Sequence, residues 1–320
     1  MNDMPMQFRR HAPAGAELPM LILPSRVGEG LRDAAERLRP RIEEALLRVG
    51  GVLLRGFAVP AVETFQQFAA LFGQPWLKRD SMPVIGMGVC APVGEPARQG
   101  MALRNEQACH REWPMKIWFH CVKAAREGGE TPIADSRAVY RRMPERIRRL
   151  FDPGVLYMRS YGSTEACWQK AFSTESRSRV GALCRQSGIS CDWMDGGGLR
   201  TWQWCPAIET HPVTGERVWF NHAHLFHACA SPAQAQPGAS AGIGQPPCRA
   251  YFADGSLMND EVLAEVRAVL DAETVSFPWQ EGDVLMLDNM LTAHGQSAFK
   301  GEREVVMAMA QLHGNLERQP

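Results

Sequence analysis

The spacing of hydrophobic positions follows a helical period over several stretches of this chain. Apolar residues recur every three or four positions there, which predicts helices that bury one face, over 31–49, 61–72, 136–151, 164–172 and 174–187. The first predicted helix contains Pro40 and is expected to end at Gly50. The second is expected to end at Gly73. These segments account for the helical part of the expected fold.

Short runs rich in β-branched and aromatic residues predict strands, over 52–57, 115–123, 200–204, 207–211, 217–221, 274–278, 284–288 and 304–312. Turn-forming residues from His211 to Glu216 separate two of these runs and predict a β-hairpin. The alternation of strand and helix that marks a parallel sheet is missing. The pattern therefore favours an α+β, mainly β fold, in which a barrel or jelly roll carries flanking helices.

We expect a single domain over 1–320, with two segments outside its packed part. Residues 1–20 are expected to form a loose N-terminal arm. Residues 231–247 are rich in Pro, Gly, Ala and Ser, which predicts a mobile loop. A loop of this length inside a compact domain is either a lid over a site or an inert surface insertion.

Charge and cysteine content narrow the class of protein. Lys and Arg total 35, and so do Asp and Glu, so no basic field is expected that would hold nucleic acid or an anionic membrane. Nine cysteines without a CxxC pair favour free thiols in a reducing cytoplasm. Neither a signal peptide nor an apolar run of about 18 residues is evident. A small molecule or another protein is the expected partner.

Glu106 and His294 are the main candidates for chemistry, and the alternative for the pair taken alone is a surface glutamate and a core histidine with satisfied hydrogen bonds. A carboxylate and an imidazole are two of the three ligands in a 2-His-1-carboxylate iron site. Side chains two positions apart on a strand point to the same side, so the second histidine of such a site belongs at position 104. Arg104 stands there instead.

Longer motifs around these residues resemble the TauD/TfdA-type iron(II)/2-oxoglutarate dioxygenases. Within that family the chain is most similar to the syringomycin-cluster-like and clavaminate-synthase-like branch, which modifies amino acids in specialised metabolism. The resemblance extends over about residues 50–312, and its most specific segments are 128–137 (GGETPIADSR) and 282–295 (GDVLMLDNMLTAHG). Supporting similarity is found at 55–57, 105–106, 113–114, 219–222, 251–256 and 279–303. It implies a double-stranded β-helix core, or jelly roll, with flanking helices and a long insertion.

The resemblance also implies roles for single residues. It places Glu106 and His294 at the metal, and it places Thr131 and Arg303 at 2-oxoglutarate. A planar guanidinium can pair with the distal carboxylate of that molecule through two hydrogen bonds. The ordinary alternatives are a turn residue for Thr131 and a solvated strand-end arginine for Arg303.

Three further residues would face the substrate cavity by the same resemblance, namely Asn105, Asn221 and His222. Structural hydrogen bonding is the alternative role for each of them. Gln296 is a departure from the family pattern, because relatives usually carry arginine at that position.

Arg104 is the most consequential departure. A protonated guanidinium has no lone pair for a metal, and its positive charge would repel Fe²⁺. Another residue would have to replace the ligand, and the candidates are Cys109, His110, His222, His224 and His227. Alternatively, Arg104 holds a carboxylate substrate or pairs with Glu106 in place of the metal.

Three functions remain open from these residues. The first is an iron(II)/2-oxoglutarate-dependent oxygenase that acts on an amino-acid-like substrate, either free or tethered to a carrier protein, with Arg104, Glu106 and His294 as the catalytic group. The second is a metal-independent or non-redox enzyme on the same fold. The third is a non-catalytic protein that binds a ligand or a carrier protein. Retention of four family residues (Glu106, Thr131, His294 and Arg303) favours the first at the family level.

Overall fold

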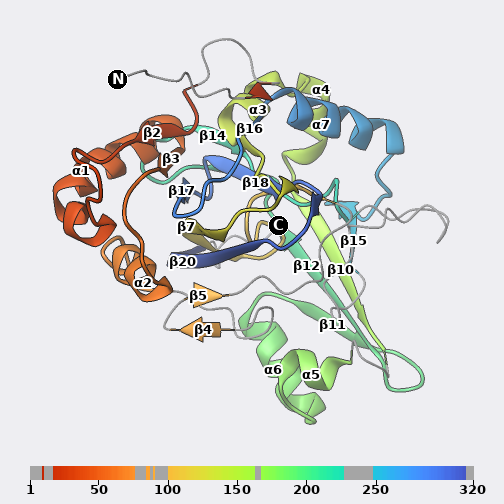
Figure 1. Cartoon of the computed structure of the whole chain (residues 1–320). Helices are drawn as coiled ribbons and strands as arrows, with labels where there is room; N and C mark the ends of the chain where they lie inside the picture. Colours follow the sequence, from red (N-terminus) through yellow and green to blue (C-terminus); the bar gives the residue numbers. More distant parts are fainter. Residues whose placement is uncertain are drawn as a thin grey trace.

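The computed structural model describes residues 9–10, 17–75, 84–86, 89–90, 100–162, 167–226 and 248–314. The loop predicted over 231–247 and most of the arm predicted over 1–20 lie outside these residues. Helices and many strands share the described chain, which confirms the expected α+β character (Figure 1).

A seven-stranded sheet forms one side of the core. Its strands run in the order β2 (Met20–Ile22), β3 (Gly51–Leu54), β17 (Val284–Asp288), β7 (Glu112–Lys123), β20 (Glu304–Gly314), β5 (Val89–Cys90) and β4 (Val84–Gly86). Helices α1 (Leu31–Val49) and α2 (Val62–Ala70) pack on one face of this sheet and share a hydrophobic cluster with it. Figure 1 shows α1 beside β2 and β3, and α2 closer to β20.

A five-stranded sheet covers the other face. Its order is β1 (Arg9–Arg10), β16 (Thr274–Ser276), β9 (Ile133–Asp135), β18 (Thr292–Gln296) and β6 (Met101–Arg104). The period of two along β17 explains how the layers join, since neighbouring side chains on a strand point to opposite faces. Val284 and Met286 contact the helical layer, whereas Leu285 packs in a cluster with Ile133 of the second sheet.

A four-stranded sheet extends from this core, in the order β11 (Ser190–Trp193), β12 (Leu199–Cys205), β10 (Val155–Tyr161) and β15 (Cys248–Phe252). Helices α5 (Trp168–Phe172) and α6 (Arg177–Gln186) lie near the far end of the long β10–β12 pair (Figure 1). Two short pairs complete the sheets, β13 (Ile208–Thr210) with β14 (Arg217–Trp219), and β8 (Glu127–Gly128) with β19 (Phe299–Lys300). The β13–β14 pair confirms the hairpin predicted around His211 to Glu216.

The predicted helix over 31–49 is confirmed with the same bounds. Gly50 follows it in the left-handed region, with φ of 87°, and its N–H donates to the Leu46 carbonyl at 2.9 Å. The single helix predicted over 136–151 is wrong. The structure has α3 (Ser136–Arg142) and α4 (Glu145–Phe151), because Pro144 lacks an N–H and forces Met143 out of the helical region.

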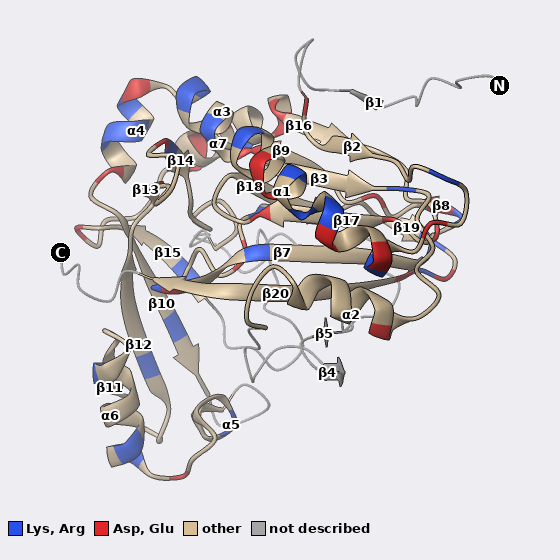
Figure 2. Cartoon of the chain, turned by 90° about the vertical axis from the view of Figure 1, so that its left-hand side faces the viewer, with Lys and Arg blue, Asp and Glu red and all other residues tan. Residues whose placement is uncertain are grey.

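Helix α7 (Asp260–Ala272) was not predicted. It packs with α3 and α4 in one hydrophobic cluster, to which they contribute Leu263, Val139 and Ile147, respectively. No helix within the described residues is long and apolar enough to cross a membrane. Figure 2 shows basic and acidic segments mixed over α1, α4 and α7, in agreement with the balanced total charge.

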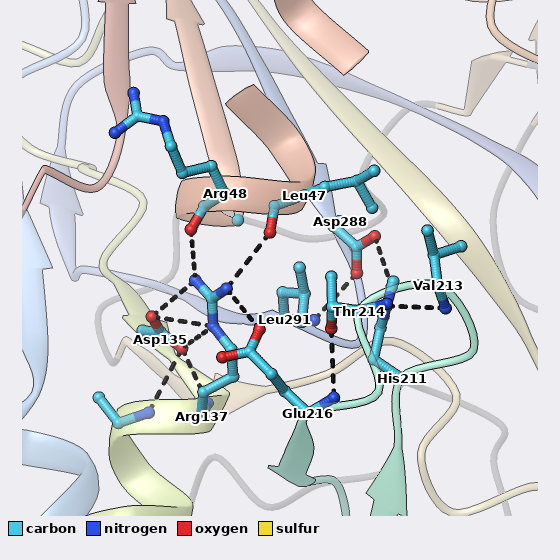
Figure 3. Close-up of polar contacts among 12 residues, drawn as sticks. Leu47, Arg48, Asp135, Arg137, His211, Val213, Thr214, Glu216, Asp288 and Leu291 are labelled. Atoms are coloured by element: carbon cyan, nitrogen blue, oxygen red, sulfur yellow. Dashed lines mark hydrogen bonds and ion pairs between the residues drawn. The ribbon is translucent and has the colours of Figure 1, made fainter. Parts of the chain in front are cut away.

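Arg137, from the GGETPIADSR motif, ties three elements together (Figure 3). Its guanidinium donates to the carbonyls of Leu47 and Arg48 at 3.3 and 3.1 Å, where α1 ends. It also forms ion pairs with Asp135 at 2.9 Å and Glu216 at 3.0 Å. The side chain therefore joins the end of α1, the start of α3 and the turn of the β13–β14 hairpin, which is a structural role.

Asp288 ends β17 and arranges the chain that leads to β18. One carboxylate oxygen accepts the N–H groups of Met290 and Leu291 at 3.0 and 2.9 Å. The other lies 3.1 Å from Nε2 of His211, which is itself held in the hairpin turn (Figure 3). This arrangement fixes the turn from which β18 carries His294 into the core.

Candidate functional site

Glu106 lies in the turn that follows β6, and the Asn289 side chain holds its backbone from both sides. Asn289 Oδ1 accepts the Glu106 N–H at 2.6 Å, and Nδ2 donates to the Glu106 carbonyl at 2.9 Å. The same Nδ2 also donates to the Pro114 carbonyl at 2.8 Å. Since Asn289 is fully buried, the backbone that carries the Glu106 side chain is held in place between β7 and the β17–β18 turn.

Asn105 belongs to the same support. Its Nδ2 donates to Ser136 Oγ at 3.0 Å and to the Asn289 carbonyl at 2.7 Å. The residue is buried, and both amide hydrogens are accounted for by these contacts. The structure thus places Asn105 in the wall that supports Glu106.

Arg104, Glu106 and His294 converge on one point. Arg104 stands opposite His294 in the β6–β18 pairing. Glu106 Oε2 is 3.9 Å from Arg104 Nε and 3.8 Å from His294 Nε2. Residues 104 and 294 are 190 positions apart, so only the sheet brings this guanidinium and imidazole to the same carboxylate.

The His294 imidazole is neutral at physiological pH. Burial lowers its pKa to about 3, and the positive charge of Arg104 acts in the same direction. Its contact with Glu106 is therefore one between a neutral ring and a carboxylate, although the distance alone is compatible with an ion pair. A neutral imidazole keeps one nitrogen lone pair for a ligand or a proton.

Arg303 and the GGETP segment form a second part of the site. Arg303 Nε donates to the Gly129 carbonyl at 2.8 Å, and Nη1 donates to Gln296 Oε1 at 3.2 Å. Gly129 has a φ of 75°, and a Cβ there would lie 3.0 Å from Arg303 Cδ, so glycine makes room for this side chain. Within the described residues, Arg303 forms no ion pair with a carboxylate.

Thr131 lies beside Gln296, the residue whose side chain contacts Arg303. The backbone N–H groups of Gly295 and Ser297 donate to the carbonyls of Pro132 and Glu130, which sets Thr131 beside Gln296. Thr131 Oγ1 accepts the Trp279 indole N–H at 3.2 Å, and the residue is buried. The hydroxyl hydrogen is then left to donate to a ligand.

His222 and His224 hold the two residues that flank Arg104. His222 Nε2 lies 2.7 Å from the Asn105 carbonyl, and His224 Nε2 lies 2.9 Å from the Leu103 carbonyl. Burial lowers the pKa of each ring to about 4, so both are neutral and donate through Nε2. The His-x-His sequence thus supports the end of β6.

Asn221 and His110 also make contacts within the protein that support the fold. Asn221 bridges the Ala207 carbonyl and the Ala223 N–H, each at 3.0 Å. His110 Nδ1 lies 3.3 Å from Cys109 Sγ, and Nε2 lies 3.3 Å from Arg159 Nη2. A guanidinium can only donate, so Nε2 is the acceptor in that contact. His227 lies outside the described residues.

Arg159 is a neighbour of the site that sequence reasoning missed. It lies on β10, a strand that the hydrophobic pattern did not predict, and it donates to the Cys109 carbonyl at 3.1 Å. A lone arginine in an apolar run carries no motif that would have singled it out.

The family model for "Taurine catabolism dioxygenase TauD, TfdA family" matches residues 20–309. The chain belongs to this family of iron- and 2-oxoglutarate-dependent oxygenases. It is 34% identical to the dapdiamide synthesis protein DdaC of Enterobacter agglomerans, over 84% of each chain. It is 29% identical to a clavaminate synthase-like protein of Arabidopsis thaliana, over 84% of this chain and 83% of the relative.

Solved structures agree on the fold. The structure of PvcB from Pseudomonas aeruginosa superposes with a TM-score of 0.56 at 18% identity, covering 91% of this chain and 84% of that one. A second PvcB structure, with a TM-score of 0.55 at 18% identity, covers 91% of this chain and 85% of its own, and is described as an Fe, alpha-ketoglutarate dependent oxygenase from an isonitrile synthetic pathway.

The residues present do not fit a three-donor iron site. The described residues contain no group of three His, Cys, Asp or Glu side chains that could hold a metal ion. A guanidinium stands at the third position, 3.9 Å from the remaining carboxylate. In addition, His294 Nδ1 is buried with no hydrogen-bond partner among the described residues, whereas a metal-bound histidine almost always donates its other ring nitrogen to one.

Proposed function

We propose that this protein is an oxygenase-like enzyme that binds 2-oxoglutarate and acts on an amino-acid-like small molecule in specialised metabolite biosynthesis. In this proposal the chain is a single TauD-like domain with a double-stranded β-helix core. Thr131 and Arg303 bind the co-substrate, and Glu106 and His294 are the donors retained from the family's metal site. The cytoplasm is the proposed compartment, and the substrate is free or tethered to a carrier protein.

The environment of Arg303 carries this proposal. A charge taken out of water is costly unless an opposite charge pairs with it. The Arg303 guanidinium is partly buried, and its contacts within the described chain go to neutral oxygens of Gly129 and Gln296. A carboxylate of 2-oxoglutarate would supply the missing counter-charge, with Thr131 as a second donor.

The names of the relatives support the substrate class. DdaC is a dapdiamide synthesis protein, and another relative is clavaminate synthase-like. Both names belong to the chemistry of small molecules, and together they favour a biosynthetic role for this chain.

The position of Arg104 favours a second function, that of a metal-independent enzyme or ligand-binding protein on the same fold. Here the guanidinium holds the Glu106 carboxylate where the family has a metal, and it can attract an anionic substrate. Neutral His294, 3.8 Å from Glu106, could then exchange a proton with that substrate.

An anaerobic titration separates the two functions. Fe²⁺ and 2-oxoglutarate are added to the wild type and to Arg104→His, and the charge-transfer absorption of a chelated complex is recorded. A band for the wild type would support the oxygenase. No band for the wild type and a band for Arg104→His, which restores the third donor, would support the metal-independent function. A band of equal strength in the wild type would show that iron binds despite Arg104 and would exclude the metal-independent function.

A further inference from the structure

Arg159 brings a positive charge to the inner face of the four-stranded sheet. Side chains two positions apart on a strand share a face. Tyr157, two positions earlier, points the same way and accepts the His222 N–H on its hydroxyl at 2.7 Å. Arg159 therefore lies on the face of β10 that is turned toward His222 and the Glu106 turn.

Within the part of the chain that the structure describes, this guanidinium contacts only neutral groups. Arg159 Nη2 lies 3.1 Å from the Cys109 carbonyl, 3.5 Å from Cys109 Sγ and 3.3 Å from His110 Nε2. Burial raises the pKa of the nearby Cys248 thiol to about 12, so that thiol is uncharged at physiological pH. Among the residues that the structure describes, no carboxylate pairs with Arg159.

The strand that carries Arg159 and the two strands beside it contain no acidic residue. Strands β10, β12 and β15 each carry one arginine and no Asp or Glu, as their basic segments in Figure 2 illustrate. The Arg159 side chain remains partly exposed. An uncompensated charge that is enclosed but reachable is the arrangement expected of an anion-binding residue.

The charge also lies next to the candidate site. Arg159 contacts the turn that presents Glu106, three residues before Cys109. The charges of Arg159 and Glu106 both act on the buried ring of His222. Arg303 instead contacts Gly129 and Gln296, so the two arginines serve different parts of the site.

We propose that Arg159 binds the carboxylate of the substrate and thereby selects free amino-acid-like acids. This proposal rests on the proposed function, since it assigns the second ligand of the same site. All hydrogen bonds of Arg159 within the described residues use Nη2, which leaves the donors of Nε and Nη1 for a ligand. A substrate bound through this carboxylate cannot be joined to a carrier protein by the same group.

Calorimetry on the whole 320-residue chain tests the assignment. The probes are the twenty L-α-amino acids and their carboxamides, each titrated in the presence of 2-oxoglutarate. We expect at least one free acid to bind the wild type and its carboxamide to bind at least ten-fold more weakly. Arg159→Gln should weaken binding of that acid by at least ten-fold and leave the Kd for 2-oxoglutarate within two-fold.

Two further variants keep the result interpretable. Arg200 pairs with Ser160 across the β10–β12 ladder and is exposed, so Arg200→Gln removes one charge from the opposite face of the same sheet. That variant should bind the acid like the wild type. Arg159→Lys keeps the charge but loses the planar guanidinium that can donate two hydrogen bonds to one carboxylate. This variant should bind the acid with intermediate affinity.

Three results would overturn the assignment. They are equal binding of acid and carboxamide by the wild type, unchanged binding of the acid by Arg159→Gln, and no binding of any free acid by the wild type. If 2-oxoglutarate still binds in these cases, the proposed function stands and only the role of Arg159 fails. Failure of 2-oxoglutarate to bind the wild type would instead count against the proposed function.

Discussion

Two arginines of the candidate site differ in what surrounds them. Arg104 has the Glu106 carboxylate 3.9 Å away, whereas Arg303 contacts neutral oxygens within the described chain. Within the described residues only Arg104 of the two therefore has a carboxylate within 4 Å, and Arg303 forms no ion pair. Burial lowers the pKa of Arg303 because it removes water from the charged guanidinium. A bound carboxylate would offset part of this desolvation.

Removing the side-chain donors of Arg303 and Thr131 should weaken 2-oxoglutarate binding. Arg303→Gln loses a charged hydrogen bond of about 1.5–3 kcal/mol, which corresponds to roughly ten- to hundred-fold in Kd. Thr131→Val keeps the shape but loses the hydroxyl, and we expect about 0.5–1.5 kcal/mol. Isothermal titration calorimetry without iron measures both effects.

Lys300 provides the matched control, because it is exposed, lies close in sequence and pairs with Glu127 on the surface. Lys300→Gln should bind 2-oxoglutarate like the wild type. Unchanged affinity in both Arg303→Gln and Thr131→Val would place the 2-oxoglutarate site elsewhere.

At the scale of elements, several motif residues connect strands and loops instead of facing a ligand. Arg55, after β3, donates to both carboxylate oxygens of Asp283 at 2.9 and 2.5 Å, just before β17. It also donates to the Pro278 carbonyl at 2.8 Å. This buried pair fastens two neighbouring strands of the seven-stranded sheet at the same end.

Breaking that pair should be strongly destabilising. Arg55→Met leaves the Asp283 carboxylate buried without its partner, and we expect the free energy of unfolding to fall by about 3–5 kcal/mol. The double variant Arg55→Met/Asp283→Leu should recover part of this loss, because it removes the uncompensated charge as well. Urea unfolding monitored by circular dichroism provides the measurement.

Lys300→Met serves as the comparison, since its exposed pair with Glu127 should contribute at most about 1 kcal/mol. A loss for Arg55→Met no larger than that of Lys300→Met would argue that the Arg55–Asp283 pair has no special weight in the fold.

At the scale of the whole molecule, three buried neutral histidines surround the end of β6. His222, His224 and His294 have pKa values lowered to about 4, 4 and 3 by burial, below the value of about 6.5 for an exposed ring. The unfolded chain then binds more protons than the folded one below pH 6.5. The free energy of unfolding therefore carries no penalty from these histidines above pH 6.5, and it declines as the pH falls toward 4.

His224→Gln tests this dependence. Glutamine can still donate to the Leu103 carbonyl but does not titrate, so the variant should lose less stability on acidification. Between pH 7.5 and 5.0, we expect the wild type to lose about 2 kcal/mol more unfolding free energy than His224→Gln. The same loss in both proteins, followed by urea unfolding, would contradict a neutral buried His224.

The spacing of hydrophobic residues predicted helices and strands well where a segment buries a single apolar face. The helix over 31–49 has its predicted bounds, and β17 coincides with the predicted strand over 284–288. Strands β6, β9, β10 and β18 were missed because their burial depends on neighbouring sheets and leaves no regular alternation in the sequence. Pro144 was the readable signal for the break between α3 and α4.

The sequence by itself determined the family motifs, the departure at Arg104 and the pair Glu106 and His294. These follow from residue identity and local spacing, which do not depend on the path of the chain. Only the tertiary structure decided that Arg104 stands against both residues, that His222 and His224 hold the backbone around it, and that Arg159 approaches from another sheet. Such contacts join residues about 50–190 positions apart, and packing of the sheets selects them.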